Sequence, residues 1–257
     1  MRLEDRRQAI VDLLVERGSA GLDDLAARFD VSRMTIHRDL DDLEAAGLLR
    51  KVRGGATIEA SSRFESDWRW RERQFAPEKR LIAAHAARMV EPGMSVVVDD
   101  STTATALGPH LAALRPLTVV TNNLALLSAL AQAPGIALIA LGGTYSPKFN
   151  GFFGLMTDEA LKGLRADVAL MSTSAVRDLA AFHQDGEVVG AKRRMMRSAT
   201  RSVLLADHGK FGRTALHFLA ELDRFDAVVT GPGLGAAERR ALRDGKVRIE
   251  VAGEGAA

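Results

Sequence analysis

Short apolar runs, rich in Val, Ile and Leu, alternate with helical stretches over residues 77–257, and this alternation limits the possible folds more than any other feature. Seven of the runs predict buried strands, at residues 96–98, 117–120, 136–141, 168–171, 202–205, 227–229 and 247–251. Helices are predicted between most of them, at residues 81–90, 103–114, 123–131, 158–164, 187–200 and 236–244. Strands that alternate with helices in this way form an open, mostly parallel sheet with helices on both faces. We therefore predict an α/β fold for this part of the chain.

The first 58 residues instead predict short helices that are separated by tight turns. The helices are expected at about residues 4–17, 23–29 and 32–46. After them, residues 48–52 and 56–58 predict two strands, which Arg53-Gly54-Gly55 joins as a β-hairpin. Helix, tight turn, helix and hairpin is the layout of a winged helix-turn-helix, whose recognition helix enters the major groove of DNA.

The basic side chains of this region gather on the third predicted helix and the hairpin. Because Ile36, Leu40 and Leu43 recur at helical spacing and should face the core, the polar residues near the start of the helix remain outside. The residues that we predict to contact DNA are Ser32, Arg33, Thr35, His37 and Arg38 on the helix, and Arg50, Lys51 and Arg53 on the hairpin. Acidic and basic residues are similar in number here, so a helical bundle with a charged surface is the alternative.

A polar, arginine-rich stretch separates the two parts of the chain. We predict a linker at residues 59–76, between a DNA-binding domain at 1–58 and an effector-sensing domain at 77–257.

The formal net charge is only +2, so bulk charge gives no argument for nucleic acid. The absence of cysteine excludes disulfides, thiol nucleophiles and cysteine-ligated metals. Because no apolar run has the length of a membrane span and the N-terminus does not resemble a signal peptide, we expect a cytoplasmic protein.

Small polar residues follow the predicted strands, and ligands of such sheets bind at the carboxyl ends of the strands. The predicted ligand-binding residues are Asp99, Ser101, Thr102 and Thr103 after the first strand, Thr121 and Asn122 after the second, Gly142 and Gly143 after the third, and Asp207 and Lys210 after the fifth. Hydroxyls and free amides at helix starts favour anions, and a lysine adds positive charge. Alternatively, the hydroxyl residues are plain caps, the glycines form a turn and Lys210 is a solvated surface lysine. Their shared position favours a phosphate or carboxylate ligand.

Ordered motifs in both parts of the chain resemble the DeoR/GlpR family of bacterial repressors. In the first part the motif runs Leu25-Ala26-x-x-Phe29-x-Val31-Ser32-x-x-Thr35-Ile36-x-Arg38-Asp39-Leu40 and closes with Gly54-Gly55-Ala56. In the second part it includes Asp99 with Thr102-Thr103, Thr118-Val119-Val120-Thr121-Asn122, Leu141-Gly142-Gly143, Lys192-Arg193 and Ala206-Asp207-x-x-Lys210-Phe211. The resemblance implies a sensor domain with the fold of ribose-5-phosphate isomerase and CoA transferases. It also implies sugar phosphates as effectors, and it adds Lys192 to the expected effector site.

Three positions depart from the family pattern. His37 stands where the family usually has a second arginine, which predicts a weaker phosphate contact or a different base preference. Ser101 replaces a usual glycine, so the loop after the first strand should be stiffer or narrower. Gly231 stands where an aspartate is usual.

Two other functions fit parts of the sequence. Residues 227–236 read as a strand followed by Gly231-x-Gly233-x-x-Ala236 and a helix, which imitates the NAD-binding fingerprint and would suit a redox-sensing repressor. A sugar-phosphate isomerase-like enzyme with a DNA-binding domain would need a carboxylate base, for which Asp99, Asp100, Asp185 and Glu187 are candidates. The histidines show no metal-ligand spacing.

From the sequence we therefore expect a transcription regulator and not an enzyme. It should repress carbohydrate metabolism genes, bind double-stranded operator DNA as a homodimer or homotetramer, and leave that DNA when a phosphorylated sugar or a similar phosphate ester binds. No cofactor, metal or membrane is expected.

Overall fold

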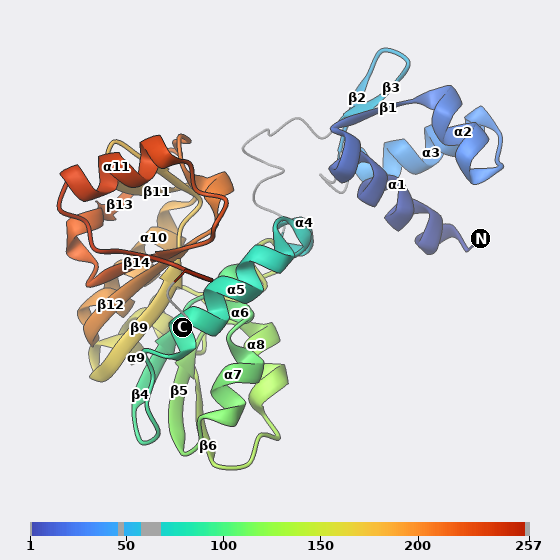
Figure 1. Cartoon of the computed structure of the whole chain (residues 1–257). Coiled ribbons are helices and arrows are strands. Elements are labelled where there is room, and N and C mark those ends of the chain that lie inside the picture. Colours follow the sequence, from blue (N-terminus) through green and yellow to red (C-terminus); the bar gives the residue numbers. More distant parts are fainter. Residues whose placement is uncertain (1, 46–48, 58–67, 255–257) are drawn as a thin grey trace. The chain divides into compact units, whose positions relative to one another are not determined.

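The computed structural model describes residues 2–45, 49–57 and 68–254, and the chain divides into two compact units, Met1–Arg71 and Glu72–Ala257 (Figure 1). Parts of several predicted elements lie outside the described residues: Ala46 of the third helix, Leu48 and Ile58 of the hairpin strands, and most of the linker, residues 59–67. The end of the predicted linker contains a short helix, α4 (Trp68–Arg73). The domain limits drawn from the sequence remain a prediction.

The first unit has the helices and the hairpin that the sequence predicts. Its elements are α1 (Leu3–Arg17), β1 (Ser19–Gly21), α2 (Leu22–Phe29), α3 (Arg33–Ala45), β2 (Arg50–Val52) and β3 (Gly55–Thr57). The unpredicted strand β1 pairs with β3, so the hairpin is part of a three-stranded antiparallel sheet. At Gly55 a Cβ atom would lie 2.1 Å from the carbonyl oxygen of Ala20, so this pairing requires glycine.

The core of the first unit is built from the apolar stripes of its three helices. Ile10, Leu14, Leu25 and Ile36 are fully buried in it, and Leu40 is almost fully buried. These are the residues that the helical spacing places on the inner face, so burial of one stripe per helix explains why the three helices pack together.

The second unit contains a seven-stranded sheet, and all of its described neighbouring strands are parallel (Figure 1). In spatial order the strands are β15 (Ile249–Val251), β14 (Ala227–Thr230), β12 (Ala199–Ala206), β9 (Ala166–Ser172), β4 (Ser95–Val98), β5 (Leu117–Thr121) and β6 (Ile136–Ala140). Each corresponds to one of the seven predicted runs, which confirms the predicted α/β fold class. The strand of this sheet that comes first in the sequence, β4, lies inside the sheet, so the chain extends to the edge strand β6 and then returns to build the other half.

Helices cover both faces of this sheet. The covering helices are α5 (Ala76–Ala87), α6 (Thr102–Thr105), α7 (Gly108–Ala113), α8 (Leu124–Leu130), α9 (Leu155–Lys162), α10 (Gly186–Arg197) and α11 (Ala236–Asp244). Alternate residues of β4 separate the two cores: Val96 and Val98 pack in the cluster that contains Ile82 of α5, whereas Val97 packs in the cluster that contains Met195 of α10. Burial on both faces explains why the strands read as continuous apolar runs.

Several smaller elements were not predicted. They are the hairpin of β7 (Thr144–Ser146) and β8 (Gly151–Phe153), the antiparallel sheet of β10 (Ala175–Arg177), β11 (Ala180–His183) and β13 (His217–Glu221), and the short 3-10 helices η1 (His208–Lys210) and η2 (Leu222–Arg224). The predicted helix at 103–114 is divided into α6 and α7, and Pro109 lies in the first turn of α7. None of the helices in the described part of the chain is long and apolar enough to cross a bilayer.

Candidate functional site

The predicted recognition helix presents a polar surface near its N-terminus. Arg33, His37 and Arg38 are exposed there. Ser32 caps the helix, since its Oγ accepts a hydrogen bond from the backbone N–H of Thr35 at 3.1 Å and lies 2.9 Å from the hydroxyl of Thr35. Ser32 and Thr35 therefore also have a structural task, which is to start the helix that carries the arginines.

The acidic residues of α3 are partly neutralised by α1. The buried carboxylate of Asp39 accepts hydrogen bonds from Nε of Arg6 at 2.7 Å and from Nε of Arg7 at 2.9 Å. Arg7 also forms an ion pair with Asp42. The hydrogen bond to Asp39, together with the charge of Asp42, raises the pKa of Arg7 above its usual value. These contacts orient Asp39 toward the interior and leave the arginines of α3 as the exposed charges near its start.

Two of the residues predicted to contact DNA already have acidic partners. Arg33 lies 3.0 Å from Asp23 of α2, and Lys51 of the hairpin forms an ion pair with Asp41. Such pairs are worth at most about 1 kcal/mol where they are exposed, so a DNA phosphate could replace either acid. The other hairpin cations, Arg50 and Arg53, are exposed.

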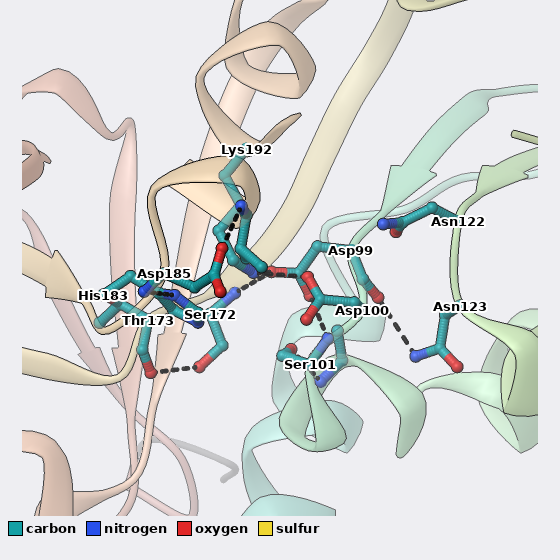
Figure 2. Close-up of polar contacts among 12 residues, drawn as sticks. Asp99, Asp100, Ser101, Asn122, Asn123, Ser172, Thr173, His183, Asp185 and Lys192 are labelled. Carbon is teal, nitrogen blue, oxygen red and sulfur yellow. Dashed lines mark hydrogen bonds and ion pairs between the residues drawn. The ribbon is translucent and has the colours of Figure 1, made fainter. Parts of the chain in front are cut away.

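In the second unit, four of the predicted effector residues, Asp99, Ser101, Asn122 and Lys192, lie together near the carboxyl ends of the strands (Figure 2). Val98 of β4 pairs with Thr121 of β5 and with Leu170 of β9, so the residues after these strands are neighbours. Figure 2 shows Asp99, Asp100, Ser101, Asn122 and Asn123 gathered there with Ser172, Thr173, His183, Asp185 and Lys192. The structure thus groups residues from four segments that are far apart in the sequence.

Asp99 is buried and is held by its own loop and by two other segments. Its Oδ1 accepts a hydrogen bond from the N–H of Ser101 at 3.0 Å, and its Oδ2 accepts one from the N–H of Ser172 at 2.7 Å. Oδ2 also pairs with the ammonium group of Lys192. Because these bonds join β4, β9 and α10, Asp99 holds the site together, and its oxygens are largely occupied by the protein itself.

Lys192 of α10 is buried between two carboxylates. Its Nζ contacts Asp99 and lies 3.1 Å from Oδ1 of Asp100, and 1% of the residue is exposed. Burial lowers the pKa of Lys192, but the charges of Asp100 and Asp99 outweigh it, so the pKa lies above its usual value. Lys192 therefore stays charged at neutral pH and is a counter-ion that the two acids share.

Several of the predicted hydroxyl and amide residues are caps and cross-strand ties. Ser101 Oγ accepts a hydrogen bond from Ala104 N at 3.1 Å and caps α6. Thr121 donates from Oγ1 to the carbonyl of Val98 at 2.6 Å. Asn123, which the sequence analysis had not chosen, caps α8 through Leu126 N at 3.1 Å. The cap interpretation thus applies to Ser101, while Thr103 is buried and offers no exposed surface.

Asn122 has a different character. It is completely buried, and its Nδ2 donates to the carbonyl of Phe152 at 3.0 Å. Its Oδ1 has no hydrogen-bond partner among the described residues. An unpaired buried oxygen costs about 1–3 kcal/mol, so an acceptor left in this state is a natural place for the hydroxyl of a ligand.

Thr102 lies beside a buried lysine that the predicted site did not include. Nζ of Lys79, on α5, donates to Thr102 Oγ1 at 3.0 Å, and Lys79 is only 3% exposed. The remaining predicted cation, Lys210, is half-buried in η1, directly after the buried Asp207. A hydroxyl with an adjacent ammonium group is suited to an anionic group of a ligand.

The two predicted glycines differ. At Gly143, where φ is +134°, a Cβ atom would lie 2.3 Å from the carbonyl oxygen of Phe153. At Gly142 a Cβ atom would meet nothing within 4 Å. Gly143 is therefore required by the close approach of the β8 backbone, and only Gly142 leaves open space.

The glycines of the NAD-like motif make room for protein side chains. A Cβ atom on Gly231 would lie 2.1 Å from Oε1 of Glu78, and one on Gly233 would lie 2.6 Å from Nδ1 of His208. In a dinucleotide site this space would be needed for the pyrophosphate. The motif after β14 therefore packs against Glu78 and His208.

Three of the four candidate carboxylates for an enzyme are also engaged, and the fourth, Glu187, is exposed. Asp99 and Asp100 pair with Lys192, and Asp185 caps α10 by accepting hydrogen bonds from Glu187 N at 3.0 Å and Val188 N at 3.3 Å. A general base needs a free, suitably oriented oxygen. The contacts of Asp99, Asp100 and Asp185 instead hold the local structure together.

A groove of about 360 Å³ lies at the opposite, amino ends of β12, β14 and β15. It contains none of the predicted effector residues, and ion pairs line it: Glu250 lies 2.8 Å from both His85 and Arg248. Burial raises the pKa of Glu250, but the hydrogen bonds from His85 and Arg248 outweigh it and lower the pKa below its usual value.

Two protein-family models match the chain. Residues 6–62 match the DeoR-like helix-turn-helix domain, and residues 74–232 match the DeoR C terminal sensor domain. The chain is 32% identical to the glycerol-3-phosphate regulon repressor of Haemophilus influenzae, over 90% of each protein. It is 30% identical to the L-fucose operon activator of the same organism, over 89% of this chain and 92% of the relative.

Among solved structures, ribose 5-phosphate isomerase A from Methanocaldococcus jannaschii matches with a TM-score of 0.37 and 17% identity, over 52% of this chain and 53% of that one. The sequence matches cover both units, and their names confirm the prediction of a regulator and not an enzyme. The chain belongs to the DeoR family of DNA-binding transcriptional regulators.

Proposed function

We propose that the chain is a cytoplasmic repressor of carbohydrate metabolism genes that a phosphorylated sugar or related phosphate ester releases from its operator. The proposal of a ligand rests mainly on Oδ1 of Asn122. This buried oxygen has no hydrogen-bond partner in the described chain, and it lies near the carboxyl ends of the strands. The names of the relatives support the class of regulated genes, since one acts on a glycerol-3-phosphate regulon and another on an L-fucose operon.

The contacts suggest a division of labour within this effector site. Asn122 Oδ1 accepts a hydrogen bond from a sugar hydroxyl. Thr102, Lys79 and Lys210 bind the phosphate, for which hydroxyl and ammonium donors are suited. Lys192 holds Asp99 and Asp100 in place, so it acts through them.

In the first unit, Arg33, His37 and Arg38 of α3 face the DNA, and Arg50, Lys51 and Arg53 of the hairpin contact phosphates. The protein binds as a homodimer or homotetramer, because a palindromic operator matches a two-fold arrangement of recognition helices.

Fluorescence anisotropy tests this function with labelled DNA from upstream of the protein's own gene. The titration is run at two salt concentrations, with and without a phosphate-ester panel of glycerol 3-phosphate, glucose 6-phosphate, fructose 6-phosphate and ribose 5-phosphate. We expect tight, salt-sensitive binding that one ester of the panel weakens. Binding that the esters strengthen would indicate an activator of the kind found among the relatives. Binding that no ester alters would contradict the proposed ligand class.

A control variant separates the two sites. Asn122→Leu removes the acceptor oxygen while it keeps a similar volume, so operator binding without ester should be unchanged and the response to the ester should weaken by tenfold or more, about 1.4 kcal/mol. Loss of operator binding in Asn122→Leu would show that the sheet edge does not act as a separate sensor.

A further inference from the structure

The first turn of α5 is bonded to the loop that carries two of the effector residues. The loop between β12 and β13 contains Asp207, His208 and Lys210. His208 donates from its backbone N–H to Oε1 of Glu78 at 3.1 Å, and Nδ1 of its ring lies 2.5 Å from Oε2. Both carboxylate oxygens of Glu78 therefore hold this single residue, which lies between Asp207 and Lys210.

The packing around this contact is equally specific. Phe75, at the residue before α5, has φ of +51°, and its ring meets the ring of His208 edge to face at 4.5 Å. A Cβ atom on Gly209 would lie 2.4 Å from the Phe75 ring, and one on Gly231 would lie 2.1 Å from Glu78. The backbone around Glu78 and His208 thus uses glycine where side chains of other residues would block the contact.

The same turn of α5 also touches the other side of the effector site. Lys79, the residue after Glu78, donates to Thr102 Oγ1 at 3.0 Å. Two consecutive residues of one helix turn therefore reach the loop after β12 and the first residue of α6, the helix that follows β4. A ligand that moved either of them would change the contacts of this turn.

The position of α5 in the chain gives this turn its significance. The first unit ends at Arg71, α4 (Trp68–Arg73) crosses that boundary, and α5 begins at Ala76. The first turn of α5 is thus the part of the sensor unit that is joined through the shortest stretch of chain to the unit with the recognition helix.

We propose that the Glu78–His208 contact couples effector binding to operator binding. When the phosphate engages Lys210 and Thr102, the loops shift, and Glu78 and Lys79 pass that shift to α5 and so to the preceding chain. The inference rests on the proposed function, because an effector can act only through a difference in affinity between two arrangements. Glu78 and His208 are positioning residues in this scheme, since they act through the loop and through α5.

The test measures coupling and not only binding. In the first titration, the full-length protein is titrated with operator DNA in the absence and in the presence of the phosphate-ester panel. In the second, the esters of the panel are titrated into the free protein and into the operator-bound protein. The ratio of the two operator affinities must equal the ratio of the two ester affinities, because coupling is reciprocal. In Glu78→Ala and in His208→Ala we expect this ratio to fall from the wild-type value, typically about 5- to 150-fold, to within about twofold of one.

The controls separate coupling from loss of structure. Glu91→Ala removes an exposed glutamate of the same unit and should keep the wild-type ratio. The double variant Glu78→Ala/His208→Ala should show no further loss, because both single changes break one contact. Operator affinity without ester should stay within about threefold of wild type, since α3 is untouched.

Two outcomes are distinguishable failures. If the wild type itself does not respond to the panel, the proposed function fails and the coupling scheme falls with it. If the wild type responds and Glu78→Ala keeps the wild-type ratio, only the coupling scheme is overturned. The same holds if each single variant loses ester affinity together with coupling and the two losses add in the double variant.

Discussion

Lys192 and Asp100 form an ion pair across 3.1 Å in which the side chains are only 2% and 1% exposed. Asp99, whose side chain is completely buried, contacts the same ammonium group. Two acids and one lysine inside an apolar fold are costly to desolvate, and the attraction between the ammonium group and the two carboxylates offsets part of that cost. These three side chains thus form a structural cluster at the carboxyl ends of the strands, where we propose the effector site.

Replacement of Lys192 by methionine should destabilise the sensor unit strongly. Lys192→Met leaves two buried carboxylates without their cation, and breaking a buried pair in this way costs about 3–5 kcal/mol. Urea unfolding followed by circular dichroism measures the change. Lys162→Met is the matched control, since Lys162 is exposed and forms an exposed pair with Glu159 three residues before it, so its loss should cost under about 1 kcal/mol. Equal stability of the two variants would contradict the structural role of Lys192.

The contribution of Lys192 to the free energy of unfolding should fall at high pH. The pKa of Lys192 is raised in the folded protein, so its contribution is fully present below the unfolded value of about 10.4 and is lost as the pH rises through the higher folded value. The stability difference between wild type and Lys192→Met should therefore be constant at pH 7 and 9 and shrink above about pH 10.4. A difference that shrinks already between pH 7 and 9 would show that the pKa of Lys192 is not raised.

The parallel sheet was predictable because its strands are buried on both faces and therefore read as unbroken apolar runs. The small antiparallel elements were not predictable in the same way. Strands β1 and β10 have three residues each and β11 has four, so none of them is long enough to show clearly the alternation of a half-buried strand. Their pairing depends on partners distant in the chain, such as β13, which no local pattern reveals.

The sequence predicts the position of the candidate site in the sheet, but only some of the polar residues that gather there. The rule that ligands bind at strand ends located Asn122 and Thr102, because the topology brings these ends together. Lys79 lies in a helix, His183 is the last residue of an unpredicted strand and Asp185 comes after that strand, so the rule does not reach them. The sequence does not reveal which polar residues cap helices and which keep an unpaired polar atom, because this depends on hydrogen bonds between distant parts of the chain. Ser101 became a cap, and Asn122 kept an oxygen without a partner in the described chain.

Gly143 and Gly142 should differ sharply in their tolerance of a methyl group. Gly143→Ala would place Cβ 2.3 Å from the Phe153 carbonyl at a φ of +134°, so we expect a loss of at least about 2 kcal/mol in the free energy of unfolding. Gly142→Ala meets nothing within 4 Å and should change stability by less than about 1 kcal/mol. Thermal unfolding of both variants checks this, and similar melting temperatures would contradict the close approach of β8.

Gly142→Ala also serves as a probe of the ligand. Because this variant should fold normally, a weakened response to the phosphate-ester panel would place its Cβ in the path of the ligand. An unchanged response would remove Gly142 from the proposed effector site and leave Asn122 and Thr102 in it.

Asp39 should be essential to the stability of the DNA-binding unit. Its carboxylate is 1% exposed and accepts hydrogen bonds from both Arg6 and Arg7, so Asp39→Ala leaves two arginines without their shared partner and should cost about 3–5 kcal/mol. Asp42→Ala is the control, because Asp42 is 59% exposed and should contribute less than about 1 kcal/mol. Limited proteolysis of the full chain measures the effect, and cleavage within residues 1–71 should accelerate only in Asp39→Ala. Equal cleavage in both variants would show that Arg6 and Arg7 do not need Asp39.

Arg38 should contribute to operator binding without any role in effector binding. It is exposed on α3, and removal of a single DNA contact of this kind costs about 1–3 kcal/mol. In Arg38→Ala we expect weaker operator binding and an unchanged affinity for the phosphate-ester panel. The slope of log affinity against log salt should become shallower by about 0.9 if Arg38 contacts a phosphate, and should stay the same if it contacts a base edge. Arg243→Ala, at an exposed arginine of α11 in the other unit, is the matched control. If both variants bind the operator like the wild type, the recognition surface lies elsewhere than on the N-terminal half of α3.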